Sequence, residues 1–567
     1  MYSKLVLHLA LVPHAAMTSI QSVVEVFTGN WRVSLSIGAL ILILAIISRS
    51  PNTKRPPQLN DTIPYVSNTI QYLTDAGRFL DRVNKTLEAT KSNIVGFYVG
   101  LRPAYIVTGS KNVQSVFGSP HVLDGNFLQL ILMDKHWGMT KDEINKFAKD
   151  TSGRLKTPAP GTESVHEDQR FWLGHDRLFA EYLTKQKYSD ALADSFQTLF
   201  SQRLDKQVTA EWTTVGLFEL LKTTMAESAV ISLFGSKIVD LNPGFLECYW
   251  AFDDIAGTLV WGLPNFMQRS AVRVRDRLHK MTRKHIDSAW EHFDWSGPDA
   301  DSVWEPHFGS RLSRETAKWL RQKGFSNHAA AGHTLASLFG LNGNTVPISA
   351  WAMIELIKDP SLYKAVREEV LRTRITDPDT LETRLDARSL INMPLMQSLY
   401  TEIMRMHVSF NVTREAKQPI EIDGYHLEKR SLIQTCSQIA HFEESVWGTE
   451  GHPASEFWAR RHVKYVGKMD KVSGEIRNVP IFSMKGRPSS FFPYGGGYVM
   501  CPGRHFAKQE ILLAVAVMAT KFDIEFLGCK NLDGSKPGRS AHDDKRFAGF
   551  IAMSPDREME IRMKRIS

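Results

Sequence analysis

The sequence predicts a mainly helical fold with a smaller β part, preceded by an N-terminal membrane anchor helix. Three observations support this prediction: long stretches place apolar residues at helical spacing, strand patterns cluster late in the chain, and one apolar run near the N-terminus is uncharged. We therefore divide the chain into an N-terminal segment (1–49) with its anchor at about 33–47, a Pro-rich hinge (50–59) and a globular domain (60–567).

The predicted anchor is the uncharged run VSLSIGALILILAII at residues 33–47, with Trp31 before it and Arg49 after it. Trp and Arg are residue types that membrane interfaces favour. The run of about 15 residues is shorter than the roughly 20 that span a bilayer comfortably, so a buried helix is the alternative. Lys54 and Arg55 follow, and positive charge on this side predicts a cytosolic domain. We expect a single-pass protein of the endoplasmic reticulum membrane.

Helical spacing dominates the globular domain. Trp212–Phe234 is one helical stretch and ends before Gly235, a residue type that commonly terminates helices. Glu315–Lys358 contains two helical stretches, and Leu390–Arg405 contains another. These stretches predict that helices form the larger part of the fold.

Strand patterns appear mainly after residue 419. Ile420–Ile422 and Tyr425–Leu427 alternate between apolar and polar residues, and Asp423 and Gly424 lie between them. Two short alternating runs joined by Asp-Gly predict a β-hairpin. Phe547–Arg565 also alternates in places, which predicts a sheet at the C-terminus.

Composition and charge exclude several classes of protein. The chain has 567 residues, of which 43% are hydrophobic and 23% charged, as in ordinary globular proteins. The formal net charge is +8, but no run of five or more Lys or Arg occurs, so we expect no nucleic-acid partner. A basic surface favours anionic membrane or an acidic protein partner, and dispersed solvated charge is the simpler explanation.

The cysteines are too few and too far apart for a zinc site or a disulfide framework. Their scarcity fits a reducing compartment. Any cysteine chemistry therefore depends on a single side chain. The four cysteines are Cys248, Cys436, Cys501 and Cys529.

The segment FFPYGGGYVMCPGRHFAKQE at residues 491–510 is the richest in candidate functional residues. Its glycines at 495–497 permit a close approach by a flat ligand. An apolar helical face follows from Phe506, and Pro502 suits the first turn of that helix. Cys501 is thus expected at a helix N-terminus, where free N–H groups favour the thiolate needed to bind a metal. The alternative is a small apolar residue in a glycine turn.

This segment resembles the signature of the cytochrome P-450 superfamily: an aromatic residue, a glycine, a cysteine and a second glycine, here Tyr494, Gly497, Cys501 and Gly503. Tyr494 replaces the usual Phe. Val499 stands where a basic residue commonly meets a haem propionate. The resemblance implies a cytochrome P-450 fold and haem b (iron protoporphyrin IX) with Cys501 as the metal ligand. A thiolate ligand pushes electron density onto the iron and favours O–O cleavage.

The resemblance also implies a structural network upstream of the cysteine. Glu402 and Arg405 form the family's Glu-x-x-Arg pair, and residues three apart lie on the same side of a helix. Such a pair alone is usually an exposed salt bridge of little energy. Arg461 is expected as the third member, in a segment where Ala459 replaces the family's proline.

Two further positions bear on how a haem would be held. Arg414 lies where family members often bind a propionate, and Arg suits contacts with carboxylates. The helical segment that starts near Trp172 lacks the family's W-x-x-x-R spacing, because Asp176 occupies the Arg position. We assign this segment no role.

The best match to the family's oxygen-side helix is Ala336–Ile357. Pro347 removes one helical hydrogen bond and is expected to open the helix at 343–345, although a plain kink in a core helix is the alternative. Most family members carry an acid and then Thr here, as part of proton delivery to oxygen. This chain has Gly343 and Asn344, followed by Thr345, and we take Asn344 and Thr345 as the candidate catalytic residues.

Asn at this position, followed later by Pro, resembles the pattern of the family branch that contains cholesterol 7α-hydroxylase, sterol 12α-hydroxylase and prostacyclin synthase. An amide cannot shuttle a proton as an acid does, but it can hold a water molecule or orient an oxygen. Because that branch includes an isomerase, this helix leaves the type of reaction open.

The resemblance implies that residues 60–567 form a haem-thiolate catalytic domain, a monooxygenase. It would activate O2 with electrons from a membrane-bound NADPH–cytochrome P-450 reductase and oxidise a lipophilic small molecule. The chain is similar to filamentous-fungal members, so a terpenoid, steroid-like or other secondary-metabolite substrate is expected. Two alternatives remain: a peroxide isomerase or dehydratase that needs no reductase, suggested by Asn344, and a non-catalytic haem-binding protein.

Overall fold

The computed structural model describes residues 55–376, 383–469, 475–535 and 539–566. Residues from Pro56 onward form one compact unit. The predicted anchor at 33–47 lies outside the described residues.

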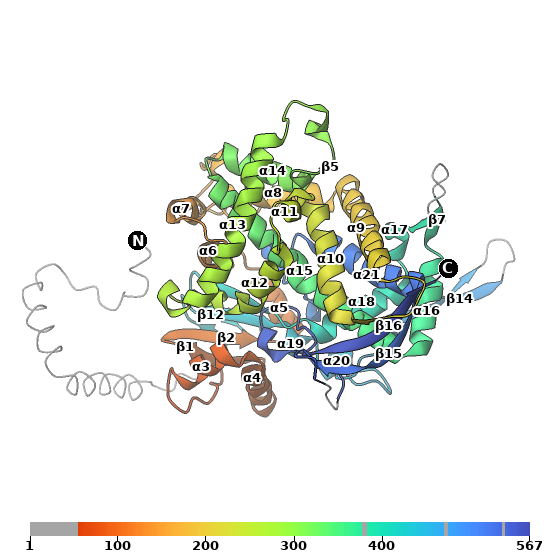
Figure 1. The fold of residues 1–567 in the computed structure, drawn as a ribbon. Coiled ribbons are helices and arrows are strands. Elements are labelled where there is room, and N and C mark those ends of the chain that lie inside the picture. The colour runs from red at the N-terminus through yellow and green to blue at the C-terminus, as the bar shows by residue number, and fades with distance from the viewer. Residues whose placement is uncertain (1–54, 377–382, 470–474, 536–538, 567) are drawn as a thin grey trace, which may run out of the picture. The chain divides into compact units, whose positions relative to one another are not determined.

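Helices make up most of the compact unit, and the longest of them, α15, passes through its middle (Figure 1). The helices are α3 (Ser67–Thr74), α4 (Ala76–Thr90), α5 (Ser110–Phe117), α6 (Asn126–Lys135), α7 (Lys141–Lys149), α8 (Phe171–Thr184), α9 (Gln186–Gln207), α10 (Leu217–Phe234), α11 (Lys237–Asp240), α12 (Phe245–Val260), α13 (Arg269–His292), α14 (Arg311–Gln322), α15 (Asn327–Lys358), α16 (Pro360–Leu371), α17 (Ala387–Leu390), α18 (Pro394–His407), α19 (Ser437–Ala440), α20 (Glu444–Trp447) and α21 (Arg504–Lys521).

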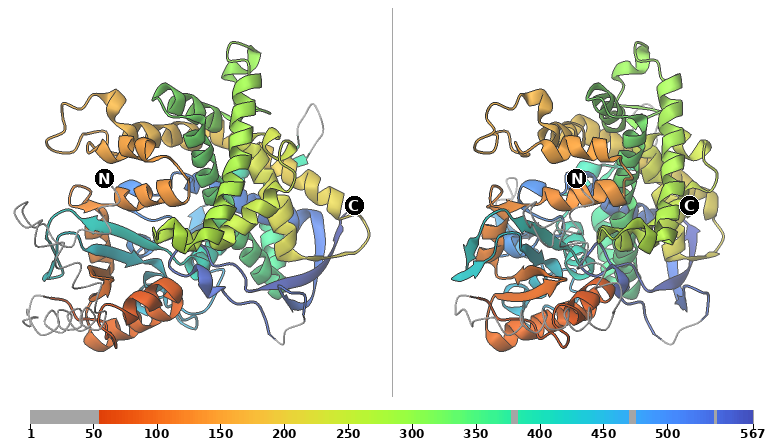
Figure 2. Two further views of the ribbon diagram at one scale, coloured as in Figure 1. Left: turned by 60° about the vertical axis from the view of Figure 1, so that its left-hand side comes forward. Right: turned by 90° about the vertical axis from the view of Figure 1, so that its left-hand side faces the viewer.

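The strands form a five-stranded sheet in the order β1-β2-β12-β9-β3, a three-stranded sheet in the order β15-β16-β4, and short hairpins. The two larger sheets lie at opposite ends of the helical part, which both views of Figure 2 show. The strands are β1 (Ile94–Val99), β2 (Arg102–Val107), β3 (Leu123–Asp124), β4 (Thr213–Gly216), β5 (Trp304–Glu305), β6 (Gly309–Ser310), β7 (Arg374–Thr376), β8 (Thr383–Leu385), β9 (Asn411–Ala416), β10 (Ile420–Ile422), β11 (Tyr425–Leu427), β12 (Leu432–Cys436), β13 (Val463–Met469), β14 (Ile476–Phe482), β15 (Phe522–Asn531) and β16 (Arg557–Arg565).

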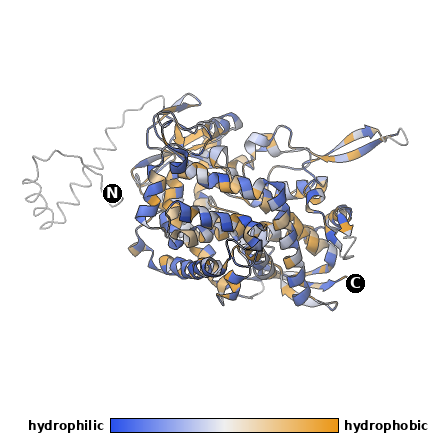
Figure 3. Ribbon diagram, turned by 90° about the horizontal axis from the view of Figure 1, so that it is seen from above, coloured by the Kyte–Doolittle hydropathy of each residue, from blue (hydrophilic) through white to orange (hydrophobic). Residues whose placement is uncertain are grey.

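The core of the unit is built by helices α10, α15, α18 and α21, whose apolar residues belong to one buried cluster. Hydrophobic and hydrophilic residues alternate along most of the other helices, as expected for helices with one buried face (Figure 3). Ser326 caps α15, because its side chain accepts a hydrogen bond from the backbone N–H of Ala329. The sequence prediction of a mainly helical fold with a smaller β part is therefore confirmed.

The predicted hairpin at residues 420–427 is confirmed as strands β10 and β11, which pair antiparallel. Asp423 and Gly424 form its turn with φ angles of 53° and 77°. Both central residues are thus left-handed, as this turn type requires. The predicted C-terminal sheet is also present, but within the predicted segment Phe547–Arg565 only the last part forms a strand, β16.

Two local predictions about helices are wrong. Thr213–Gly216, expected to begin a helix, forms β4 instead, because Val215 pairs with Ile561 of the distant strand β16. The helix α15 runs unbroken through Pro347, so the predicted opening at residues 343–345 is absent. Packing of α15 against α10, α13, α18 and α21 holds the helix together where the proline removes a hydrogen bond.

The predicted localisation as a single-pass membrane protein is contradicted. Among the residues that the structure describes, no helix has both the length and the apolar content needed to span a bilayer. The run at 33–47 on which the prediction rested is about 15 residues long, shorter than the roughly 20 required.

Candidate active site

The cysteine loop lies directly before α21, and its glycines have a structural reason. Gly497 has a φ of 68°, and a Cβ there would lie 2.6 Å from the carbonyl oxygen of Phe117. A Cβ on Gly496 would lie 2.2 Å from the ring of the same phenylalanine. The glycines thus allow α5 to pack closely on the loop, a contact that the sequence did not predict. The backbone N–H of Cys501 donates to the carbonyl of Tyr494 at 3.0 Å and closes the loop.

Cys501 lies three residues before the first helical residue of α21, with Gly503 at the N-cap position. We expected Pro502 in the first turn, but the helix begins at Arg504. Burial by the surrounding protein raises the pKa of the Cys501 thiol, while backbone hydrogen bonds from Gly503 and Arg504 and the charge of Arg504 lower it. The net shift is upward, opposite to our expectation, because burial outweighs these hydrogen bonds and the charge of Arg504.

Tyr494 connects the cysteine loop to α18. Its hydroxyl contacts the hydroxyl of Tyr400 on α18. Burial raises the pKa of Tyr494 well above its ordinary value, so the phenol is neutral. This hydroxyl contact joins the cysteine loop to the helix that carries Glu402 and Arg405.

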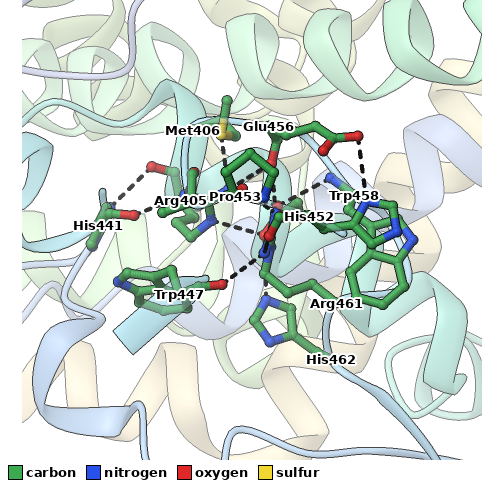
Figure 4. A network of polar contacts seen from close by, with 12 residues as sticks. Arg405, Met406, His441, Trp447, His452, Pro453, Glu456, Trp458, Arg461 and His462 are labelled. Atoms are coloured by element: carbon green, nitrogen blue, oxygen red, sulfur yellow. Dashed lines mark hydrogen bonds and ion pairs between the residues drawn. The ribbon is translucent and has the colours of Figure 1, made fainter. Parts of the chain in front are cut away.

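Glu402, Arg405 and Arg461 are in contact, as the sequence predicted, and none of their side chains is exposed. Figure 4 shows the network of polar contacts around Arg405 and Arg461. Glu402 Oε1 accepts from Arg405 Nη2 at 2.7 Å and from Arg461 Nε at 2.8 Å, and Oε2 accepts from Arg405 Nε at 2.9 Å. His462 Nε2 lies 3.5 Å from Oε2. Sequence reasoning missed this histidine, which follows Arg461 directly and had no motif to mark it.

The two arginines also fix a long loop. Arg405 Nη1 donates to the carbonyl oxygens of His441 and Ala454 at 2.8 and 2.6 Å. Arg461 Nη1 donates to the carbonyl of Trp447 at 2.7 Å. Burial tends to raise the pKa of Glu402, but the hydrogen bonds and charges of its partners outweigh burial and lower this pKa to about 2. The Glu402 carboxylate is therefore ionised, and together with its two arginines it holds α18 against the segment after α20.

The candidate catalytic residues of α15 face different neighbours. Asn344 Oδ1 accepts from the backbone N–H of Ala552 at 3.0 Å. The Thr345 hydroxyl contacts the carbonyl oxygen of Leu341 at 2.6 Å and Glu510 Oε1 of α21 at 3.0 Å. Thr345 thus connects α15 to the helix that follows Cys501, and Asn344 connects it to the loop before β16.

Comparison with known proteins decides the family. The model of the family "Cytochrome P450" matches residues 139–536. The "Cytochrome P450 monooxygenase calL" of Penicillium decumbens is 43% identical over 94% of this chain and 97% of its own length. The chain belongs to the cytochrome P450 family. It is a P450 monooxygenase, an oxidoreductase, and the relatives' names do not favour the isomerase or carrier alternatives.

More distant proteins agree with this membership. The "Cholesterol 7-alpha-monooxygenase" of Cricetulus griseus is 22% identical over 90% of this chain and 95% of its own length. The solved structure "Retinoic acid bound cyanobacterial CYP120A1" has a TM-score of 0.61 at 15% identity and covers 90% of this chain and 99% of its own. The second likeness confirms the P450 fold, and family membership implies haem and O2.

Residues near the cysteine loop fit the carboxylates of a haem. Arg414 is 3% exposed, and its Nη2 donates to the carbonyl of Gly496 in the loop at 2.8 Å. Its Nε has no hydrogen-bond partner among the described residues. The guanidinium carbon lies 5.5 Å from the centre of the Tyr498 ring. A buried cation with an unused donor suits an anionic group, and the P450 haem carries two carboxylates.

A second arginine near this place was missed by sequence reasoning. Arg154 Nη1 donates to Asp176 Oδ1 at 2.6 Å, and its Nε donates to Asn126 Oδ1 at 2.7 Å. Its guanidinium carbon lies 4.4 Å from the centre of the Trp172 ring. Burial lowers the pKa of Arg414 most, Tyr498 and Asp124 raise it, and the charge of Arg154 lowers it further. The two cations are therefore close enough to interact. Asp176 thus stands in the family's Arg position and binds an arginine from the preceding loop.

Proposed function

We propose that this protein uses haem b, with Cys501 as the sulfur ligand of the iron, to insert one atom of dioxygen into a C–H bond of a lipophilic small molecule. The placement of Cys501 carries the proposal: the side chain lies just before α21 behind the glycine loop, and backbone groups of Gly503 and Arg504 partly offset the burial that raises the pKa of its thiol. When bound, haem supplies the redox chemistry that activates dioxygen. The catalytic domain is the globular segment 60–567 of our division, within the compact unit that begins at Pro56.

The other site residues hold the haem and its ligand in place. Arg414 and Arg154 are proposed to bind the haem carboxylates, since both are buried cations, Arg414 donates to the carbonyl of Gly496 in the cysteine loop, and the charge of Arg154 acts on Arg414. Tyr494, Gly497 and Gly503 shape the loop. The network of Glu402, Arg405 and Arg461, described above, anchors α18 against the segment that leads to the loop.

On the α15 side we propose positioning roles for Asn344 and Thr345. The Asn344 amide oxygen is engaged by Ala552, which fixes the side chain and leaves its N–H groups for a water molecule or an oxygen ligand. Thr345 fixes the distance between α15 and α21 through Glu510.

The electrons come from NADPH through a P450 reductase. The substrate class is a terpenoid, a steroid-like molecule or another secondary metabolite. Similarity to a Penicillium monooxygenase and to an enzyme named for cholesterol supports this class. Binding spectra against a panel of such precursors would identify the substrate.

The iron ligand is tested by Cys501→Ser, with Cys529→Ser as the matched control at another half-buried cysteine. The reduced carbon monoxide complex of the wild type should show the red-shifted Soret band of a thiolate-ligated haem. We expect Cys501→Ser to lose this band and Cys529→Ser to keep it. An unchanged band in Cys501→Ser removes Cys501 as the ligand.

The electron source is tested separately. With a substrate identified by its binding spectrum, product should form only when both NADPH and a reductase are supplied. Turnover without NADPH, reductase or added peroxide would contradict the proposed monooxygenase cycle and favour an isomerase. Turnover supported by peroxide alone would exclude a passive haem carrier.

A further inference from the structure

Asp253 of α12 is a buried acid with almost no support. It is 5% exposed, and it forms no salt bridge among the described residues. Its hydrogen-bond partner is the Tyr249 hydroxyl, 3.4 Å from Oδ1, which is a long contact. Burial of a carboxylate without strong donors is costly, so such a group calls for an explanation in function.

The carboxylate lies against α15 at Gly343. A Cβ built on Gly343 would be 2.6 Å from Asp253 Oδ1 and 3.5 Å from the Tyr249 hydroxyl oxygen. Asp253 therefore fills the space that a side chain of residue 343 would occupy. The only acid that α15 itself contains is Glu355, three turns further on. At Gly343, the residue before Asn344, the acid that contacts α15 is thus Asp253 of α12.

The surroundings of Asp253 keep its proton exchangeable near neutral pH. Its pKa is raised to about 7: burial raises it most and the charge of Asp254 adds to this, while the Tyr249 hydroxyl and Lys222 of α10 act in the opposite direction. His136, at the end of α6, packs on the neighbouring Phe252, and burial lowers its pKa to about 4, so it is neutral and adds no charge. An acid with a pKa near the working pH is suited to general acid catalysis.

We propose that Asp253 donates protons to the reacting oxygen across the α12–α15 contact at Gly343, with Tyr249 as the residue that positions its carboxylate. The inference rests on the proposed function. In that reaction the substrate C–H bond, O2, two electrons and two protons give the C–OH product and water. NADPH supplies the electrons through the reductase. Asp253 passes on the protons and recovers them from solvent.

The test uses the full-length haem protein and needs no substrate. Dithionite-reduced protein is mixed with oxygenated buffer, and its reoxidation is followed by stopped-flow absorbance between about pH 5 and pH 9. The wild-type rate should rise as the pH falls through about 7 and should be slower in D2O. Asp253→Asn, which keeps the shape but cannot donate an acidic proton, should be slower by about tenfold at acid pH, with a flat profile.

Asp254→Asn is the matched control, because Asp254 is exposed on the next position of the same helix. It should keep the pH-dependent profile, with a midpoint shifted slightly to lower pH since Asp254 raises the pKa of Asp253. The inference is overturned if Asp253→Asn keeps the wild-type profile. The carbon monoxide spectrum of the same samples separates failure of this inference from failure of the proposed function. A normal thiolate band together with an unchanged profile contradicts the role of Asp253 and leaves the proposed function intact.

A carboxylate exchange provides a second, independent variant. Gly343→Asp alone would collide with Asp253, but Gly343→Asp combined with Asp253→Gly places one carboxylate in the same space from the opposite helix. We expect the double variant to recover the pH-dependent reoxidation that Asp253→Gly loses. A profile as flat as that of the single variant would overturn the role of this contact.

Discussion

Glu402 and Asp253 are both buried acids, and their surroundings push their pKa values in opposite directions. Glu402 has two guanidinium groups and a histidine around it, and its pKa falls to about 2. Asp253 has one long hydrogen bond from a phenol, and its pKa rises to about 7. The number of charged donors within reach, and not burial alone, decides which form of a buried acid is stable.

This difference separates a structural carboxylate from a reactive one. A carboxylate that stays ionised at all working pH values can hold two arginines but cannot exchange protons. A carboxylate that titrates near neutral pH is a poor structural tie and a good proton donor. Glu510 belongs with Asp253: burial raises its pKa well above the usual value, Oε1 contacts Thr345, and Oε2 has no partner among the described residues.

The largest effect is expected from breaking the Glu402 network. Glu402→Gln leaves Arg405 and Arg461 buried without a negative charge, and removing one partner of a buried ion pair costs about 3–5 kcal/mol. We expect little folded, haem-loaded protein, measured by denaturant unfolding and haem content. Glu181→Gln removes one partner of the exposed Lys185–Glu181 pair and should cost less than about 1 kcal/mol. Equal losses in the two variants would contradict the structural role of the network.

The pH dependence of stability should distinguish the two acids in sign. The folded pKa of Asp253 is raised, so its stabilising contribution is complete below about pH 4 and is lost as the pH rises through about 7. At 1.36 kcal/mol per unit this amounts to roughly 4 kcal/mol. Asp253→Asn should therefore be more stable than wild type at about pH 8 and lose that slope.

The Glu402 contribution has the opposite sign. Its folded pKa is lowered, so its stabilising contribution is present above about pH 4.5 and is lost as the pH falls toward about 2. Chemical denaturation at several pH values measures both slopes. If Asp253→Asn keeps the wild-type slope between about pH 4 and pH 7, the contrast between the two acids fails.

A cation pair extends the comparison to the haem. Arg154→Gln keeps contacts with Asn126 but removes the charge, and we expect haem to leave about tenfold faster, as one charge-assisted contact is worth roughly that factor. Transfer of haem to apomyoglobin measures the rate. Arg177→Gln is the control, because this arginine on α8 has an exposed partner, Glu167. A rate equal to that of the control would mean that Arg154 only supports Asp176.

The sequence was sufficient where function lies in adjacent residues. Residues 494–503 are contiguous, Glu402 and Arg405 are three apart on one helix, and the Asp-Gly turn defines its own hairpin. These features depend on local geometry that period and turn chemistry encode. They gave the family, the candidate iron ligand and most of the network.

The sequence was insufficient where segments far apart meet. Asp253 faces Gly343 from a helix about 90 positions earlier, and Arg154 meets Asp176 from a loop without regular structure. The strand β4 exists because β16 pairs with it from the other end of the chain. Helical spacing alone carries no signal for such contacts, since it reports which face is buried and not what buries it.

The smallest expected effect concerns a third buried acid, Glu510. Thr345→Val keeps the volume of the side chain but removes the hydrogen bond to Glu510 Oε1, which lies at 3.0 Å. Burial raises the pKa of Glu510 well above the usual value, so its carboxyl group is protonated and this hydrogen bond joins two neutral groups. Losing one neutral hydrogen bond to a buried group costs about 1–2 kcal/mol. Denaturant unfolding measures this cost, and Thr345→Ser should restore most of it. A loss as large as that of Glu402→Gln would mean that Glu510 is ionised and that its surroundings resemble those of Glu402.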